Sequence, residues 1–218
     1  MCTRFYIEKD NPAFITMAQA LKHSPLYNRF TMNAGKMVKS YGEIYPTDVV
    51  PVLAPNKDGK PCAYPMCWGV HMADGTVLFN ARSESAAVKP FFKEDWQRRR
   101  CIVPASFYYE WRHGKNQAEA LPGQNSFFHS NTDPDPGKYA IQPAGSTMTW
   151  LCGLYRFENE LPYFVILTRQ PEGDLKKIHD RMPLILPQEK IKEWISPLSD
   201  PSNLLSCSLT DMVFEKVE

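Results

Sequence analysis

Several features that often reveal a protein's class are missing from this sequence. It has no run of about eighteen apolar residues, as a membrane-spanning helix requires, so we expect no membrane partner. The segment from Met1 to Phe5 lacks the basic and then apolar order of a signal peptide, so a cytoplasmic protein is expected. No repeat, linker or low-complexity tract divides the 218 residues, which indicates one domain over residues 1–218 and a monomer.

A strong charge of one sign is also missing. The 25 lysines and arginines nearly cancel the 24 aspartates and glutamates, which leaves a formal net charge of +1. This balance gives no whole-protein attraction to nucleic acid. Any affinity for DNA must therefore come from a local group of arginines and lysines.

The six cysteines lack the spacing of a disulfide framework or a metal site. They are widely scattered, and in a reducing compartment we expect free thiols. Cys62, Cys67 and His71 offer only three ligands at an unusual spacing, and their apolar neighbours favour buried thiols in a strand. We expect no metal and no cofactor.

The sequence does contain ample material for a core, with 43% hydrophobic and 12% aromatic residues. Many short apolar segments with a few helices between them predict an α+β domain built on antiparallel or mixed sheets. Helices are predicted after Asn11-Pro12, over 85–100 with a break at Pro90, and after Pro187. Loops are predicted at 115–123 and 131–137. The predicted strands are 49–54 (near an edge, because Pro51 cannot donate), 62–70, 77–80, 101–104, 107–112, 139–142, 149–157, 163–168 and a last one from Leu205.

Cys2 follows the initiator methionine, and a small residue there usually permits removal of Met1. Cys2 would then carry an amine and a thiol on adjacent carbons, with reference pKa values of about 8 and about 8.5. A 1,2-aminothiol condenses with an aldehyde to an imine, and the thiol then closes a thiazolidine ring. Arg4 would help stabilise the thiolate if its side chain turned inward. A second-position cysteine is more often an ordinary residue, so Cys2 alone leaves the chemistry open.

Three further clusters carry polar groups suited to chemistry. Asn80 and Arg82 follow an apolar strand. Asn80 could hydrogen-bond an amine or a carbonyl, and Arg82 could bind a phosphate, although an ordinary strand-to-helix turn has the same composition. Glu110 lies among aromatics that would raise its pKa and shares a strand face with Tyr108; the alternative is a solvent-facing carboxylate. His179 suits proton transfer, and Arg181 would point the same way in an extended segment; a structural histidine is the alternative.

Together these clusters resemble the SRAP family, named for "SOS response-associated peptidase". The family's ordered motifs correspond here to Met1–Phe5, Asn80–Glu84, Arg100–Trp111 and His179–Pro183, and Trp68-Gly69 also fits. Each motif is weak singly, but their ordered combination spans nearly the whole chain and is highly specific.

The resemblance implies one compact α+β domain with barrel-like sheets, a positively charged DNA groove, and covalent capture of abasic sites in single-stranded DNA at the nucleoid. Cys2 would be the nucleophile, Glu110 and His179 the proton-transfer residues, and Asn80 the residue that orients Cys2 or the sugar. The same comparison places Arg4, Arg82, Arg181 and Trp68 in the DNA-binding surface.

This sequence departs from the family pattern at several places. Thr3 replaces the usual glycine beside Cys2, the segment Glu43–Pro46 lacks the family's asparagine, and the segment after Gly69 is short. Two other functions therefore remain open. One is a cysteine-dependent peptidase or amidase that uses Cys2 and His179, and the other is a passive single-stranded DNA binder.

Overall fold

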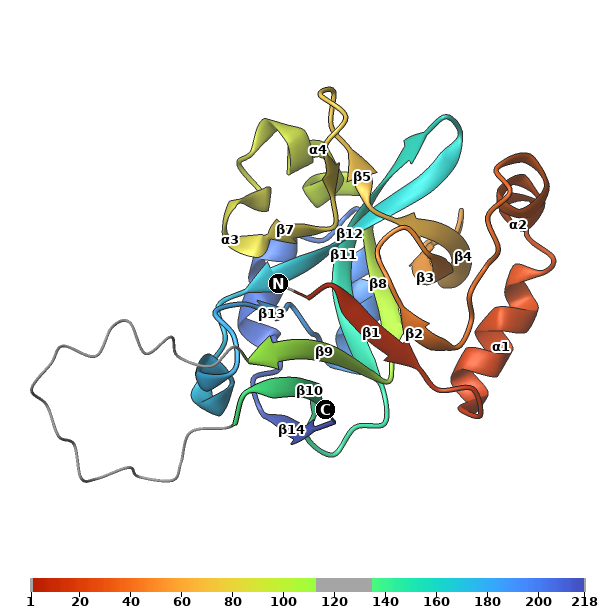
Figure 1. The fold of residues 1–218 in the computed structure, drawn as a ribbon. Coiled ribbons are helices and arrows are strands. Elements are labelled where there is room, and N and C mark those ends of the chain that lie inside the picture. Colours follow the sequence, from red (N-terminus) through yellow and green to blue (C-terminus); the bar gives the residue numbers. More distant parts are fainter. Residues whose placement is uncertain (1, 113–134, 218) are drawn as a thin grey trace, which may run out of the picture.

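The structure is a computed structural model that describes residues 2–112 and 135–217. The loop predicted at 115–123 and most of the one at 131–137 lie outside this range. Figure 1 shows two groups of strands at the centre of the molecule, with the helices arranged around them. Among the described residues, no helix is long and apolar enough to cross a membrane.

One group of strands closes into a barrel. Its strands follow each other in the order β11, β8, β3, β4 and β12, and a pairing between β11 and β12 closes the ring. Within the ring only β4 and β12 run parallel. Two short strands, β7 and β13, pair with β12 outside it. The bounds are β3 (Val49–Pro55), β4 (Pro61–Trp68), β7 (Asn80–Arg82), β8 (Arg100–Ala105), β11 (Thr149–Glu158), β12 (Leu161–Arg169) and β13 (Met182–Pro183).

The second group is an antiparallel sheet with the order β14-β10-β9-β1-β2. Ser106 connects β8 of the barrel directly to β9 of this sheet, and its backbone N–H donates to the carbonyl of Tyr6 at 2.8 Å. Phe5 of β1 lies opposite Tyr108 of β9, and both are buried. The bounds are β1 (Arg4–Ile7), β2 (Gly42–Ile44), β9 (Phe107–Arg112), β10 (Gly137–Pro143) and β14 (Met212–Lys216). The predicted α+β domain with barrel-like sheets is confirmed.

Short helices and one hairpin surround the strands. The helix predicted after Asn11 is confirmed, since the Asn11 side chain accepts from the Ala13 N–H at 3.0 Å. The predicted break at Pro90 is also confirmed, because Pro90 begins a new helix. The elements are α1 (Pro12–Leu21), α2 (Pro25–Asn28), η1 (Arg29–Asn33), the hairpin β5 (Val70–His71) and β6 (Val77–Leu78), α3 (Ser83–Ala86), α4 (Pro90–Arg98), η3 (Gly173–Lys177), η4 (Gln188–Lys190), α5 (Ile191–Ile195) and η5 (Pro201–Cys207).

Two predictions about strands are wrong. β3 is not at an edge, because it lies between β4 and β8. Its proline is tolerated because Pro51 lies opposite Pro65 of β4, and β3 pairs with β8 only at Leu53. The strand expected from Leu205 begins only at Met212, since Pro201 starts a 3₁₀ helix that includes Leu205.

Candidate active site

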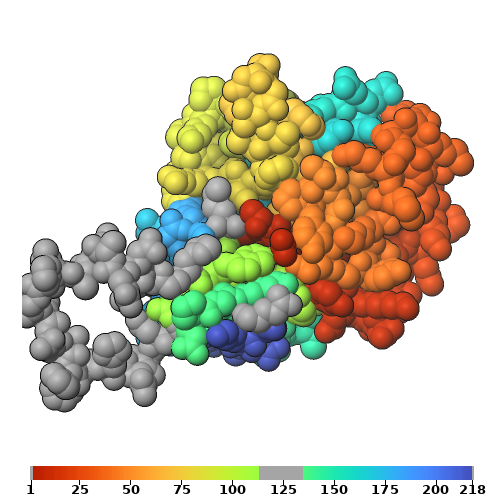
Figure 2. Space-filling model, in the orientation of Figure 1, coloured from red at the N-terminus to blue at the C-terminus, as the bar shows by residue number. Residues whose placement is uncertain are grey.

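Four parts of the chain meet where the barrel and the second sheet adjoin. Cys2 precedes β1, Asn80 begins β7, Glu110 lies in β9, and His179 follows η3. In Figure 1 the red segment that leads into β1 begins between β7 on one side and β9 and β13 on the other. In Figure 2 the N-terminal segment, in red, reaches the surface where the yellow, orange and green parts of the chain meet. The structure therefore brings together the four residues predicted to carry chemistry.

Cys2 is fully buried and is held by both its backbone and its side chain. Its carbonyl oxygen accepts a hydrogen bond from Nδ2 of Asn80 at 2.9 Å, and its Sγ lies 3.7 Å from the carbonyl oxygen of Arg4. Burial, reinforced by the nearby charge of Glu110, raises the pKa of the Cys2 thiol well above its ordinary value. The sulfur is therefore a thiol, not a thiolate, near neutral pH.

The bond to Cys2 also fixes the orientation of the Asn80 amide. Because Nδ2 donates to the Cys2 carbonyl, Oδ1 is the remaining acceptor. This Oδ1 atom is buried and has no hydrogen-bond partner among the described residues. A buried acceptor without a donor destabilises a folded protein, and a hydrogen-bond donor that enters the site would relieve this cost.

Glu110 lies on the inner face of β9, where its residue is only 3% exposed. Strand alternation places Tyr108 on the same face, while Tyr109 and Trp111 point to the other. Burial raises the pKa of Glu110 to about 7. Near neutral pH the carboxyl group is thus populated in both protonation states, which is the condition that general acid–base work requires.

His179 is close to Glu110, with 3.8 Å between His179 Nε2 and Glu110 Oε2. Two groups approach its Nδ1, and the backbone N–H of Arg181, at 3.0 Å, favours an unprotonated Nδ1 with the ring proton on Nε2. The carboxylate of Asp180, 2.8 Å from the same Nδ1, instead favours a proton there. In either state, Nε2 is the nitrogen that faces Glu110.

Arg4 does not turn inward toward the thiol, so the condition under which it would stabilise a Cys2 thiolate is not met. Its guanidinium lies 3.3 Å from Glu43 and over the rings of Tyr45 and Trp111, at 4.7 and 4.9 Å from their centroids. The side chain is 37% exposed, so its predicted contact with a DNA phosphate stays a prediction.

Arg82 and Arg181 lie beside His179 in different environments. Arg82 is exposed and lines a pocket of about 350 Å³ with Lys176, His179 and Arg181. Arg181 is nearly buried, and its guanidinium donates to both carboxylate oxygens of Glu84 at 2.8 Å. Arg181 therefore ties β13 to α3 from the wall of this pocket. Its predicted phosphate contact is not tested by this placement.

Lys176 is a residue of this pocket that sequence reasoning missed. It precedes His179 by three residues in the short helix η3 and is exposed. A basic residue three positions before a histidine is a weak signal by itself. Only the folded chain shows that it shares the pocket with Arg82.

Trp68 is a core residue. It has no exposed surface, its Nε1 donates to the carbonyl of Phe79 at 2.8 Å, and its ring lies 5.3 Å from that of Phe5. A side chain without exposed surface cannot contact DNA in this conformation. Trp68 is therefore part of the core and not of the predicted DNA-binding surface.

Cys67 and His71, two of the three residues considered as metal ligands, have other partners. Cys67 Sγ lies 3.2 Å from Lys36 Nζ, and His71 Nδ1 lies 2.6 Å from Glu158 Oε2. Within residues 2–112 and 135–217, no three histidines, cysteines, aspartates or glutamates gather as a metal site would require.

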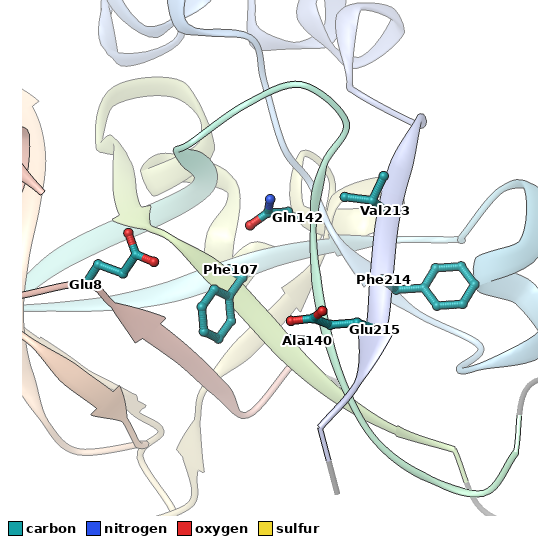
Figure 3. A pocket seen from close by; sticks show the side chains of 7 residues that line it. All are labelled: Glu8, Phe107, Ala140, Gln142, Val213, Phe214 and Glu215. Carbon is teal, nitrogen blue, oxygen red and sulfur yellow. The ribbon is translucent and has the colours of Figure 1, made fainter.

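A separate pocket of about 320 Å³ lies on the second sheet. Figure 3 shows that Phe214 points away from the other side chains that line it. Phe107 and Ala140 lie on the face of the sheet opposite Tyr108 and Glu110, because they alternate with inward residues along β9 and β10. This pocket therefore does not belong to the Cys2 site.

The fold and the site define a class of protein: an α+β barrel domain with a cysteine at position 2 enclosed by asparagine, glutamate and histidine. The sequence profile of the SOS response associated peptidase (SRAP) family matches residues 1–217. This chain belongs to the SRAP family.

Two relatives carry the name abasic site processing protein. YobE of Bacillus subtilis is 34% identical over 142 residues, which cover 62% of this chain and 57% of that protein. YedK of Escherichia coli is 33% identical over 133 residues, which cover 60% and 54%. The chain thus spans little more than half the length of these relatives.

Two solved structures have the same fold. A protein from Bacteroides thetaiotaomicron superposes with a TM-score of 0.69 at 19% identity, over 100% of this chain and 92% of the other. A phage-related protein from Bordetella bronchiseptica gives 0.66 at 21% identity, over 100% and 94%. At these identities the likeness concerns the fold alone.

Proposed function

We propose that this chain forms a covalent adduct with abasic sites in single-stranded DNA through Cys2 once Met1 has been removed. The observation that carries the proposal is the enclosure of Cys2: Asn80 binds its carbonyl, and Glu110 and His179 lie in the same cluster. Two relatives are named abasic site processing proteins, and an abasic site carries the aldehyde that an N-terminal aminothiol requires.

The chemistry proceeds without a cofactor. The α-amine of Cys2 attacks the aldehyde carbon of the ring-opened sugar, and the oxygen leaves as water, which gives an imine. Sγ then bonds to the imine carbon, and the thiol proton passes to the nitrogen, which closes the thiazolidine. Because burial keeps the sulfur protonated, the thiol carries the proton that ring closure delivers.

Each neighbouring residue has a separate role in this scheme. Glu110, with a pKa of about 7, donates a proton to the departing oxygen. His179 assists opening of the sugar ring from the exposed side of the site. The Oδ1 atom of Asn80 accepts a hydrogen bond from the α-amine of Cys2 and thereby directs the lone pair of the amine nitrogen toward the aldehyde. Arg82 contacts a neighbouring phosphate.

A denaturing gel of the protein with a single-stranded oligonucleotide that carries one abasic site tests this function. Intact mass first establishes that the protein begins at Cys2. We expect a heat-stable shifted band for the wild type and none for Cys2→Ala. Cys152→Ala is the matched control, since it removes a buried thiol of the barrel and should leave the band unchanged.

Other outcomes assign the site differently. The absence of a band from wild-type protein that begins at Cys2 would rule out the adduct. Cleavage of a peptide or amide by that protein, lost in Cys2→Ala, would then support the peptidase. Reversible, salt-sensitive binding of intact DNA with no other activity would support the passive binder.

A further inference from the structure

Tyr108 has a polar atom that the fold does not use. The residue is 1% exposed, and its hydroxyl is buried without a hydrogen-bond partner among residues 2–112 and 135–217. An unsatisfied buried hydroxyl costs on the order of 1–3 kcal/mol. A phenylalanine would fill nearly the same space without this cost, so packing alone does not account for the hydroxyl.

The position of Tyr108 places this hydroxyl at the Cys2 site. Tyr108 is two residues from Glu110 on the inner face of β9 and lies opposite Phe5 of β1, the strand that Cys2 precedes. Its hydroxyl is within electrostatic range of both Cys2 and Glu110. The pocket of Figure 3 lies on the other face of this sheet and cannot supply a partner.

Asn80 and Tyr108 thus each place at the site a buried polar atom without a hydrogen-bond partner among the described residues, and these two atoms are complementary. Oδ1 of Asn80 can only accept a hydrogen bond, whereas the Tyr108 hydroxyl can donate one. The two reacting groups supply both partners. The attacking amine has N–H groups for the acceptor, and the aldehyde has a carbonyl oxygen for the donor. Together they therefore satisfy both atoms at once.

We propose that Tyr108 is a further catalytic residue, whose hydroxyl donates a hydrogen bond to the aldehyde oxygen of the abasic sugar. This inference rests on the proposed function. As the amine nitrogen bonds to carbon, the C=O electron pair moves to oxygen, and the hydroxyl stabilises the negative charge that develops there. The oxygen takes one proton from the attacking nitrogen, which gives a carbinolamine. Glu110 then protonates this hydroxyl, which leaves as water, and recovers its proton from the iminium nitrogen.

Burial separates the roles of these two groups. It raises the pKa of Tyr108 well above its ordinary value, so the hydroxyl keeps its proton throughout the neutral range. Tyr108 is therefore a fixed donor and not a proton carrier. The contribution of its hydroxyl should not change with pH, in contrast to that of Glu110.

The test measures the rate of adduct formation by Tyr108→Phe in single-turnover reactions with the abasic oligonucleotide. We expect a decrease of about 10- to 100-fold, somewhat below the loss of a full oxyanion donor, at every pH from about 6 to about 8. The thermal midpoint should stay equal or rise, because the variant removes an unsatisfied hydroxyl. Affinity for intact single-stranded DNA should not change.

Tyr155→Phe is the matched control, because it removes the hydroxyl of a half-buried tyrosine in β11, outside the site. Its rate should equal that of the wild type. A Tyr108→Phe rate equal to that of the wild type would overturn the role of Tyr108 and leave the proposed function intact. A decrease that follows a lowered thermal midpoint would also overturn it, by assigning Tyr108 to the core. Failure of the wild type to form any adduct would instead remove the proposed function.

Discussion

At the scale of single residues, burial raises the pKa of both Cys2 and Glu110, but it moves the thiol away from neutrality and the carboxyl toward it. The Glu110 carboxyl thereby reaches a pKa of about 7. A thiolate-first peptidase would need a lowered thiol pKa, which this site does not provide. Chemistry that begins at the amine and uses a carboxyl acid near neutral pH is consistent with both shifts.

The raised pKa of Glu110 predicts a pH-dependent stability. The unfolded state ionises above its ordinary pKa of 4.5, whereas the folded state keeps the proton up to about 7. Folding therefore takes up a proton between these values, and this contribution to stability is present below pH 4.5 and lost as the pH rises to 7. The free energy of unfolding of the wild type should therefore fall by about 3 kcal/mol over that window, at about 1.4 kcal/mol per pKa unit, and Glu110→Gln should not show this fall.

Urea unfolding at pH 4.5, 5.5, 6.5 and 7.5 measures this difference. Glu215→Gln is the control, because Glu215 is an exposed carboxylate of the same sheet and its variant should keep the wild-type pH dependence. Parallel curves for the wild type and Glu110→Gln would mean that Glu110 is ionised in the folded protein.

At the scale of elements, the motif Arg100–Trp111 joins the two sheets and contains a buried arginine. Arg100 lies at the start of β8, and its guanidinium donates to backbone carbonyls of α4 and α5, including those of Trp96 and Trp194 at 2.6 Å. Burial lowers the pKa of Arg100 to about 10, so it stays charged at neutral pH. One side chain thus attaches two helices to the barrel.

We expect Arg100→Lys to destabilise the protein by about 2–4 kcal/mol, because an ammonium cannot reach the same set of carbonyls and part of that set would remain buried without a donor. Arg98→Lys, an exposed position in the last turn of α4, should change stability by less than about 0.5 kcal/mol. Denaturant unfolding of the wild type, Arg100→Lys and Arg98→Lys measures these differences in stability. Equal midpoints for wild type and Arg100→Lys would show that the carbonyls are satisfied in another way.

Local signals account for much of what the sequence predicted at this scale. Alternation in β9, the Asn11 cap of α1 and the break at Pro90 depend on neighbouring residues, and all were correctly predicted. The position of β3 depends on Pro65, a residue in another strand, and could not be inferred from Pro51 alone.

The same limit applies to the site. Ordered motifs were sufficient to identify Cys2, Asn80, Glu110 and His179 as a group. The direction of the Arg4 side chain and the burial of Trp68 depend on tertiary contacts with Glu43 and Phe5, far away in the sequence or on another strand. That the Tyr108 hydroxyl has no hydrogen-bond partner follows only from the folded structure, in which the partners of the buried polar atoms can be determined.

At the scale of the whole molecule, the net charge of +1 provides no long-range attraction, so reversible DNA binding must depend on local groups. The pocket beside His179 has such a group, with Arg82 and Lys176 both exposed and Asp180 as the opposing charge. The proposed covalent adduct would compensate for weak initial binding, because it would hold the DNA after salt has screened the phosphate contacts.

Removal of these two cations should therefore change the salt dependence of binding more than the stability of the adduct. For intact single-stranded DNA, Arg82→Ala and Lys176→Ala should each lower the slope of log affinity against log salt by roughly 0.7–1, as expected for one lost phosphate contact. Fluorescence anisotropy across a salt series measures the slope. Lys57→Ala, an exposed lysine of the turn between β3 and β4, is the control and should keep the wild-type slope. Unchanged slopes for both pocket variants would place the DNA backbone elsewhere, whereas an adduct that dissolves in high salt would mean that the bond to Cys2 does not form.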